Sequence, residues 1–294
     1  MHEQTDVPTE ITPEMIQAIA KTFAIAHAED TDEQLARALV YNTGRLAWRI
    51  RELGLTVNQK SSVSDVVTQA DTLSEAFISR VLELIRPDDG LFGEEGTHTA
   101  STSGRTWVVD PVDGTYNFVS GSDYWCSALA LITGEPNDPD TVHVGAVHRP
   151  AMGYTWVGGA GVATTRDGDA VSGIVDAHPA DISLVSYAHP RWINDDTILG
   201  VWRAVSSQFA TIRMLGAGSV DLAGVADGSW GMWMQHSVAP WDWLPGKALV
   251  EAAGGTTARV WAGGVEWFIA GNATAVNHSV AALKEADETT SGTL

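Results

Sequence analysis

Two aspartates follow a short apolar run and are separated by a proline and a valine. The run Trp107–Val109 leads into Asp110-Pro111-Val112-Asp113-Gly114-Thr115. The apolar run predicts the end of a buried strand, and the proline and glycine favour a tight turn. The residues from Asp113 to Thr115 can then begin a short helix whose backbone amides face outward. This stretch predicts two fixed carboxylates beside an anion site, which suits a divalent cation held against a phosphate.

Composition limits the classes of partner. The chain has 294 residues, a formal net charge of -20 and a single cysteine, Cys126. Its length allows one large domain or two packed lobes. The charge disfavours nucleic acid and anionic membranes as partners, and one cysteine excludes an internal disulfide framework or a cysteine-based zinc site. No stretch resembles a secretory signal or a membrane span, so we expect a cytoplasmic protein.

The elements that must position the aspartates begin with helices. Apolar spacing predicts helices over residues 13–28 and 32–53, the first capped by Thr12 at the end of a mobile tail formed by residues 1–12. A strand is predicted over residues 65–68, with Asp71 ending it and capping a helix over residues 72–85.

Short strands punctuated by glycine and proline follow the central stretch. They predict an antiparallel sheet and an N-terminal α+β lobe over residues 13–178. A C-terminal α/β lobe with a mixed sheet is expected over residues 179–294. Its last helix is predicted over residues 275–286, with a frayed end beyond Ala286.

Carboxylates at predicted strand and helix ends form the candidate chemistry. They are Asp71, Glu94, Asp110, Asp113 and Asp242. Hard oxygen donors, in a chain without cysteine pairs or an HExxH motif, favour Mg²⁺ or Mn²⁺. A carboxylate shared by two ions holds them about 3.5–4 Å apart, where they can stabilise both the attacking and the leaving oxygen of a phosphoryl transfer. Two plainer readings stay open: Asp71 as a helix cap, and Glu94-Glu95 as a solvated pair.

Small residues occupy a predicted strand-to-helix turn at Gly216-Ala217-Gly218-Ser219. The turn superficially resembles a dinucleotide-binding glycine motif. Asp221 stands where that motif needs its third glycine, and no acidic residue follows at the right place, so we reject this reading. We expect instead that the small residues let backbone amides approach a ligand closely.

Four motifs together resemble the inositol monophosphatase-like sugar phosphatases. They are Lys60–Asp71, Gly93–Glu95, Asp110–Phe118 and Trp241–Gly255, and the resemblance extends over roughly residues 15–285. It implies a layered α/β/α/β/α sandwich, Mg²⁺ dependence with two or three ions, sensitivity to lithium and a homodimer. Mn²⁺ is a possible substitute.

The resemblance also implies ligands and catalytic residues. Glu94, Asp110 and the carbonyl of Val112 would bind one ion, with a third ion often found near Glu94. Asp110, Asp113 and Asp242 would bind the second. Asp71 and Thr115 would act with Glu94 in catalysis, the first two forming the pair that activates water for in-line attack without a phospho-enzyme.

Substrate contacts are implied at positions outside the carboxylates. The amides of Gly114 and Thr115 would hold the phosphate, and Lys60 and Asp65 would lie on a mobile loop that closes near the metals. The substrate's ring would be contacted by Gly216, Ala217, Gly218 and Gln235.

Two departures from the family pattern affect specificity. Leu244-Pro245 replaces two small residues, and Gln235 stands where inositol-specific members commonly carry a glutamate. We therefore expect a Mg²⁺-dependent phosphomonoesterase acting on inositol 1-phosphate or a similar small polyol phosphate. The first alternative is a histidinol-phosphate phosphatase, followed by fructose 1,6-bisphosphatase and 3′-phosphoadenosine 5′-phosphate phosphatase. A remote alternative is a catalytically silent member that binds a phosphorylated ligand.

Overall fold

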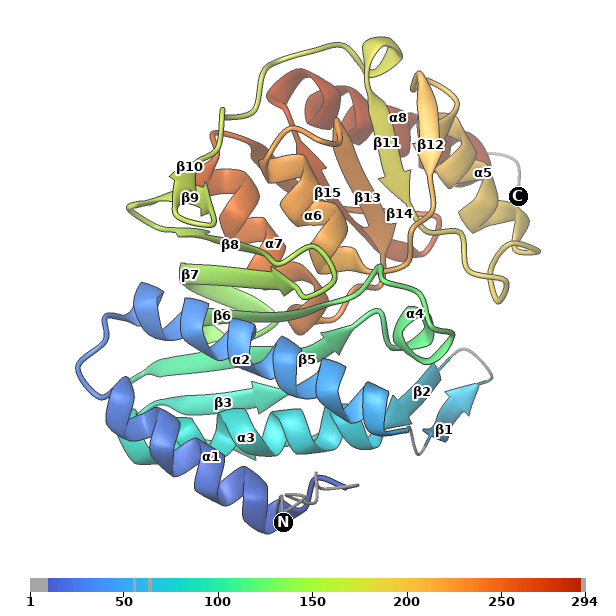
Figure 1. Ribbon diagram of the computed structural model, residues 1–294. Helices are drawn as coiled ribbons and strands as arrows, with labels where there is room; N and C mark the ends of the chain where they lie inside the picture. The colour runs from blue at the N-terminus through green and yellow to red at the C-terminus, as the bar shows by residue number, and fades with distance from the viewer. Residues whose placement is uncertain (1–9, 55–56, 63–64, 292–294) are drawn as a thin grey trace, which may run out of the picture.

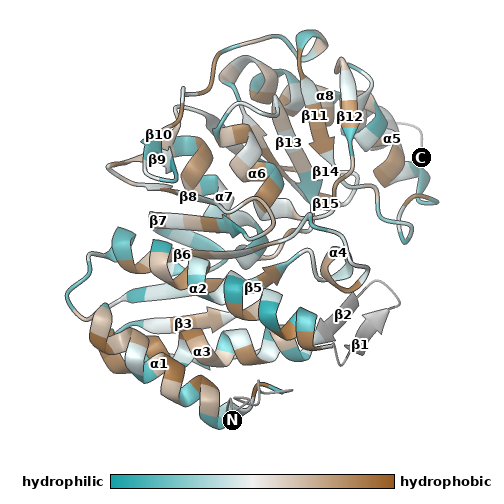
Figure 2. Ribbon diagram, viewed as in Figure 1, coloured by the Kyte–Doolittle hydropathy of each residue, from teal (hydrophilic) through white to brown (hydrophobic). Residues whose placement is uncertain are grey.

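The computed structural model describes residues 10–54, 57–62 and 65–291, with side chains described at residues 10–54 and 68–289. Its helices and sheets stack in five layers (Figure 1). The first layer holds α1 (Pro13–Ala26), α2 (Asp32–Leu53) and α3 (Gln69–Ile85). These helices cover one face of the larger sheet. Thr12 caps α1 as predicted, and Figure 2 shows apolar and polar residues mixed along all three helices, as expected of helices with one buried face.

The second layer is an eight-stranded sheet in the order β10-β9-β8-β7-β6-β5-β3-β4. All its neighbours pair antiparallel except β3 and β5, so the prediction of a mainly antiparallel sheet is confirmed. The strands are β3 (Gly90–Gly93), β4 (His98–Thr99), β5 (Arg105–Asp113), β6 (Cys126–Glu135), β7 (Asp138–Arg149), β8 (Tyr154–Gly159), β9 (Val162–Arg166) and β10 (Asp169–Ala170). A separate antiparallel pair is formed by β1 (Val57–Ser62) and β2 (Asp65–Thr68).

The remaining layers come from the second half of the chain. Helices α6 (Gly218–Ala226) and α7 (Pro240–Ala252) lie between the two sheets. The mixed five-stranded sheet has the order β12-β11-β13-β15-β14, and α5 and α8 cover its outer face. Its elements are β11 (Ser183–Ser186), α5 (Asp196–Ser206), β12 (Thr211–Arg213), β13 (Met232–His236), β14 (Thr256–Ala262), β15 (Val265–Gly271) and α8 (Ala273–Ser291), preceded by a short 3-10 helix (Pro179–Asp181). The layered α/β/α/β/α prediction is therefore confirmed.

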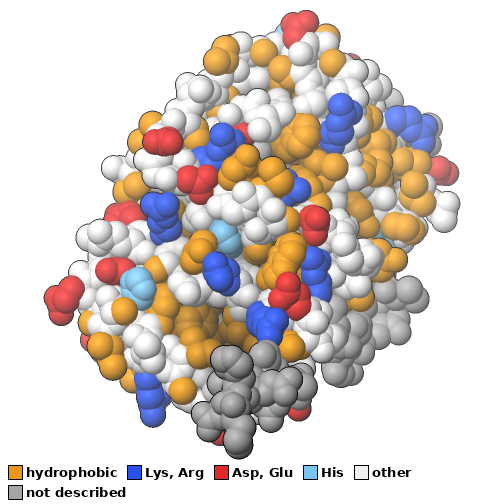
Figure 3. Space-filling view, viewed as in Figure 1, with side chains coloured by type: hydrophobic (Ala, Val, Ile, Leu, Met, Phe, Trp, Pro, Cys, Tyr) orange, Lys and Arg blue, Asp and Glu red, His pale blue; other side chains and the backbone are white. Residues whose placement is uncertain are grey.

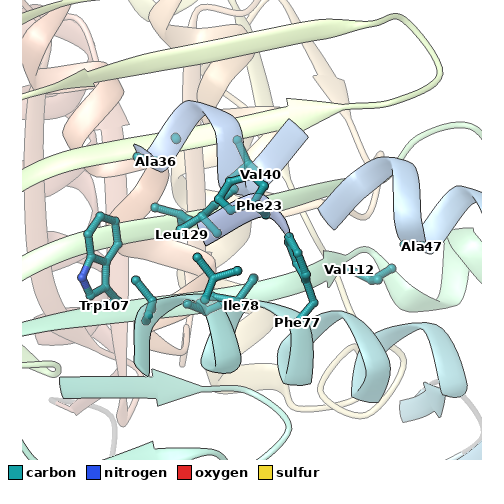
Figure 4. Close-up of a cluster of buried hydrophobic side chains, with 14 of the residues drawn as sticks. Phe23, Ala36, Val40, Ala47, Phe77, Ile78, Trp107, Val112 and Leu129 are labelled. Atoms are coloured by element: carbon teal, nitrogen blue, oxygen red, sulfur yellow. The ribbon is translucent and has the colours of Figure 1, made fainter. Parts of the chain in front are cut away.

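Buried apolar side chains fill the space between the layers. The first cluster joins α1, α2 and α3 to the large sheet. Figure 4 shows Phe23 and Val40 beside Leu129 of β6, and the ring of Phe77 packs edge-on against that of Phe23. Two further clusters pack α6 and α7 between the sheets and α5 and α8 on the outer face. On the face seen in Figure 3, basic and acidic side chains are interspersed among apolar ones.

Three sequence predictions of element ends are wrong. Helix α3 begins at Gln69, because Thr68 is the cap and Asp71 lies inside the first turn. The sequence predicted the helix before Gly254-Gly255 over residues 243–253, with Pro245 in its first turn. Helix α7 instead begins at Pro240, so Pro245 lies inside the helix, where it offers no N–H to the preceding turn. Helix α8 continues to Ser291 and does not fray after Ala286. None of the helices in the described part of the chain has the length and apolar character needed to cross a bilayer.

Candidate metal centre

Strands β3 and β5 bring two of the candidate carboxylates together at the carboxyl ends of the two strands. The strands are parallel, with Gly93 opposite Val109, so the residue after β3 lies beside the next residue of β5. These two residues are Glu94 and Asp110, and the N–H of Glu94 donates to the carbonyl of Val109 at 3.2 Å. The parallel pairing of β3 and β5 therefore explains why Glu94 and Asp110 lie side by side.

A bulge in β5 brings its two aspartates together. In a regular strand, Asp110 and Asp113 would point to opposite faces because they are three residues apart. The pairing with β6 is irregular between these residues, and the strand continues to Asp113 instead of ending at Val109 as the sequence suggested. A bulge re-aims side chains in this way. The N–H of Val112 donates to the Asp110 carboxylate at 3.0 Å and holds the local conformation.

Asp242 completes a triad of carboxylates between the sheets. It lies in the first turn of α7, and one oxygen of each of Asp110, Asp113 and Asp242 lies within 4.8 Å of the others. Asp110 and Asp113 are buried and Asp242 is partly exposed. This spacing allows one cation to contact all three side chains.

Burial and mutual repulsion strain the triad electrostatically. Burial, with the neighbouring charges of Glu94 and Asp113, raises the pKa of Asp110 well above its ordinary value. Burial also raises the pKa of Asp113 and that of Asp242. Two like charges about 4 Å apart repel by about 4 kcal/mol at an effective dielectric constant of 20. No lysine or arginine among the described side chains forms an ion pair with the triad, so a bound cation is the natural source of compensation.

Asp113 also caps α6, one of the helices that lie between the two sheets. Its carboxylate accepts the N–H groups of Gly218 at 3.2 Å and Ser219 at 2.5 Å, at the start of α6. Asp113 was expected to help begin the short helix α4 (Thr115–Val119), whose cap is instead Gly114 with no side-chain hydrogen bond. The capping expectation is wrong because α6 offers unpaired amides and lacks a side-chain cap of its own.

Asp71 and Thr115 lie within hydrogen-bonding reach of each other. The Thr115 hydroxyl is 3.3 Å from one oxygen of Asp71 and 3.0 Å from the carbonyl of Val112. The other Asp71 oxygen accepts both the N–H of Thr68 at 2.9 Å and its hydroxyl at 2.5 Å. Thr68, which the sequence reading did not single out, therefore fixes the rotamer of Asp71 through a capping box.

A cavity of about 460 Å³ lies beside the triad and is lined by Glu94, Asp113 and Asp242. Glu94 is outside the tight triad but faces the same space. The implied substrate residues Gly114, Thr115, Gly216, Ala217, Gly218 and Gln235 also line the cavity. The structure thus places three of the implied metal ligands and the implied substrate residues around one cavity.

Other residues on the cavity wall were missed from the sequence. They are Tyr116, Asn117, Tyr187, His189, Met214, Leu215, Asp221 and Trp233. Trp233 lies two residues before Gln235 on β13, and period-two alternation puts both on one face, which is a signal that the sequence did contain. Tyr187 and His189 come from the loop after β11, which carries no motif.

Close packing fixes the Gly216 turn against β5 and α4. The amide of Asn117 donates to the carbonyls of Tyr124 and Leu215, both at 2.8 Å. Gly114 has a φ of 89°, and a Cβ there would lie 3.1 Å from the carbonyl oxygen of Gly216. Lys60 and Asp65 belong to β1 and β2, but their side chains lie outside the described residues.

The donor set fits Mg²⁺. The triad, Glu94 and the carbonyl of Val112 all offer hard oxygen atoms, the ligands that Mg²⁺ prefers. Val112 can accept the Thr115 hydroxyl and still coordinate, because a carbonyl has two lone pairs.

Comparisons with known proteins place this site in a family. A model of the inositol monophosphatase family matches residues 25–290. The chain is 33% identical over 243 residues to histidinol-phosphatase of Mycobacterium tuberculosis, with 76% of this chain and 85% of the relative covered. It is also 33% identical to inositol-1-monophosphatase of Rhizobium meliloti, with 73% and 80% covered. The structure of suhB from Bartonella henselae matches with a TM-score of 0.75 at 24% identity, covering 90% of this chain and 98% of that one.

The layered fold and the carboxylate triad define an α/β/α/β/α protein with a candidate metal centre. Because the family match covers most of its length, the chain belongs to the inositol monophosphatase family, a family of phosphatases. The resemblance drawn from the four motifs is confirmed.

Proposed function

We propose that the protein is a Mg²⁺-dependent phosphomonoesterase that hydrolyses inositol 1-phosphate or a similar small polyol phosphate by in-line attack of water. The observation that carries the proposal is the triad of Asp110, Asp113 and Asp242, whose oxygens converge within 4.8 Å beside a cavity. In this proposal Glu94, Asp110, Asp113, Asp242 and the carbonyl of Val112 hold the ions. Bound Mg²⁺ would supply charge neutralisation of the phosphate and of the leaving oxygen.

The protein's own groups orient water and substrate. The Thr115 hydroxyl lies 3.3 Å from Asp71, which supports the proposal that this pair takes a proton from the attacking water. The amides of Gly114 and Thr115 are proposed to hold phosphate oxygens. The Gly216–Gly218 turn and Gln235 are proposed to contact the alcohol part of the substrate.

Gln235 favours a neutral polyol over an amine. A carboxamide can donate to and accept from hydroxyls, but it gives an ammonium no opposite charge. The carboxylate lining the cavity outside the proposed metal ligands is Asp221, and it already accepts the Tyr124 hydroxyl at 2.6 Å. Histidinol phosphate is the second candidate, because a relative of similar identity is named histidinol-phosphatase. Burial raises the pKa of Asp221 well above its ordinary value, which weakens this carboxyl group as a partner for an ammonium.

The substrate is tested by phosphate release from a panel of candidates. The panel holds inositol 1-phosphate, histidinol phosphate, fructose 1,6-bisphosphate and 3′-phosphoadenosine 5′-phosphate. We expect the highest kcat/KM for inositol 1-phosphate; a clear preference for another member would replace the proposed substrate. Hydrolysis of no member, with Mg²⁺ present and the fold intact, would favour a silent phospho-ligand-binding protein. We also propose that the protein is a cytoplasmic homodimer. Analytical ultracentrifugation can measure whether the purified protein is a dimer.

A further inference from the structure

A buried glutamate outside the proposed catalytic set lies under the turn that carries Glu94. Glu75 is only 2% exposed and sits on α3, one helical turn after Asp71. One carboxylate oxygen accepts the N–H of Glu95 at 2.8 Å, and the other accepts the N–H of Thr97 at 2.9 Å. Burying a carboxylate is costly unless it is hydrogen-bonded, and these two backbone N–H groups meet that need.

Gly93 makes room for that carboxylate. A Cβ at Gly93 would overlap both oxygens of Glu75, so only glycine fits while the side chain keeps its place. The turn closes through bonds of its own, from the N–H of Gly93 to the carbonyl of Thr97 at 2.9 Å and from the N–H of Gly96 to the carbonyl of Gly93 at 3.3 Å. The turn thus has hydrogen bonds of its own, and the two bonds to Glu75 attach it to α3.

We propose that Glu75 is a positioning residue for the metal centre. Its carboxylate locks the Gly93–Thr97 turn onto α3 and thereby holds Glu94 in place for an ion. The same helix carries Asp71, so one rigid element aligns the water-orienting aspartate and the turn of a metal ligand. This inference rests on the proposed function, because it assumes that Glu94 binds an ion.

The test measures Mg²⁺ binding to substrate-free protein by calorimetry. Glu75→Gln keeps the size of the side chain but turns an amide NH₂ toward a backbone N–H, so one of the two bonds is lost. We expect Mg²⁺ affinity to fall about 10- to 100-fold, the usual effect of losing a group that orients a metal ligand. Glu83→Gln is the matched control, because Glu83 is an exposed residue of the same helix paired with Arg80; its affinity should equal that of the wild type.

A double variant separates positioning from general destabilisation. If Glu75 acts through Glu94, adding Glu75→Gln to Glu94→Gln should cause little further loss of affinity, whereas independent effects would multiply. Melting of the metal-free proteins reports any loss of fold separately. Gly93→Ala displaces the same carboxylate from the opposite side and should repeat the result if Glu75→Gln folds poorly.

The outcomes distinguish the two proposals. Normal Mg²⁺ affinity in folded Glu75→Gln or Gly93→Ala, or multiplying effects in the double variant, overturns the positioning role and leaves the proposed function standing. Absence of Mg²⁺ binding by the wild type, or normal affinity in Glu94→Gln, overturns the metal assignment and the positioning role with it.

Discussion

The carboxylate of Asp113, at the end of β5, accepts the N–H of Ser219 at 2.5 Å, at the start of α6. A residue of the large sheet thus caps a helix that packs between the sheets. The same side chain belongs to the triad with Asp110 and Asp242. Asp113 therefore links the candidate metal centre to the turn that lines the substrate cavity.

Asp113→Asn should remove both functions of this side chain. The amide offers one acceptor oxygen and turns donors toward the α6 N–H groups, so it is a poor ligand and a poor cap. Loss of a residue that only orients a metal ligand costs up to about 100-fold in activity. Because Asp113 is proposed to be a ligand itself, we expect kcat/KM to fall by more than that. Steady-state hydrolysis at saturating Mg²⁺ measures this, with circular dichroism to verify the fold. Full activity in a folded variant would contradict the proposal that Asp113 is a metal ligand.

Thr115→Val tests the proposed water-orienting pair. The variant keeps the shape of the side chain but removes the hydroxyl that lies 3.3 Å from Asp71. We expect kcat to fall about 100- to 10,000-fold, the usual contribution of positioned acid–base groups, with Mg²⁺ affinity changed far less. Thr72→Val, at an exposed residue of α3, is the control and should retain activity. An unchanged kcat in Thr115→Val would show that the hydroxyl has no catalytic role.

Gln235→Glu tests how the cavity discriminates between substrates. A carboxylate here adds an opposite charge for the ammonium of histidinol phosphate and still accepts hydroxyls from inositol 1-phosphate. We expect the ratio of kcat/KM values to move about tenfold toward histidinol phosphate, equivalent to about 1.4 kcal/mol. Competition between the two substrates measures the ratio directly. A ratio that stays fixed would mean that residue 235 does not contact the part of the substrate that differs.

Much of this arrangement follows from local sequence signals. The helix cap at Thr12, the short strands around glycines and the turn after Val109 are local features, and they predicted the first helix, a mainly antiparallel sheet and carboxylates at element ends. The layered fold and the grouping of Asp110, Asp113 and Asp242 at one ion followed from the resemblance of four motifs to a known family. The contact between Asp113 and Ser219 depends on how distant segments pack, so no local pattern reveals it. Tyr187 and His189 were missed for the same reason, because they come from a loop without regular spacing. The hydrogen bonds from Glu95 and Thr97 to Glu75 could not be predicted either, because a glutamate in an amphipathic helix usually faces solvent.

A buried histidine should make the stability of the protein depend on pH. His148 is 1% exposed and lies 2.8 Å from the Thr155 hydroxyl, and burial lowers its pKa to about 4. The unfolded chain binds this proton below about pH 6.5, so the free energy of unfolding should fall as the pH drops from about 6.5 to 4. The full effect is about 3 kcal/mol.

Urea unfolding at several pH values measures this dependence. His148→Asn removes the titrating ring and keeps a hydrogen-bonding group, so its unfolding free energy should lose that part of the pH dependence. An identical pH profile in the variant and the wild type would assign the acid sensitivity to other groups.

The central claim is that the triad holds Mg²⁺ for phosphate ester hydrolysis. The most direct measurement is phosphate release from inositol 1-phosphate as Mg²⁺ is removed with a chelator and restored, in wild-type protein and in Asp242→Asn. We predict that wild-type hydrolysis stops without Mg²⁺ and returns with it, and that the variant stays inactive at the same Mg²⁺ concentration. Hydrolysis that persists in chelator, or that survives at the wild-type rate in Asp242→Asn, would contradict the claim.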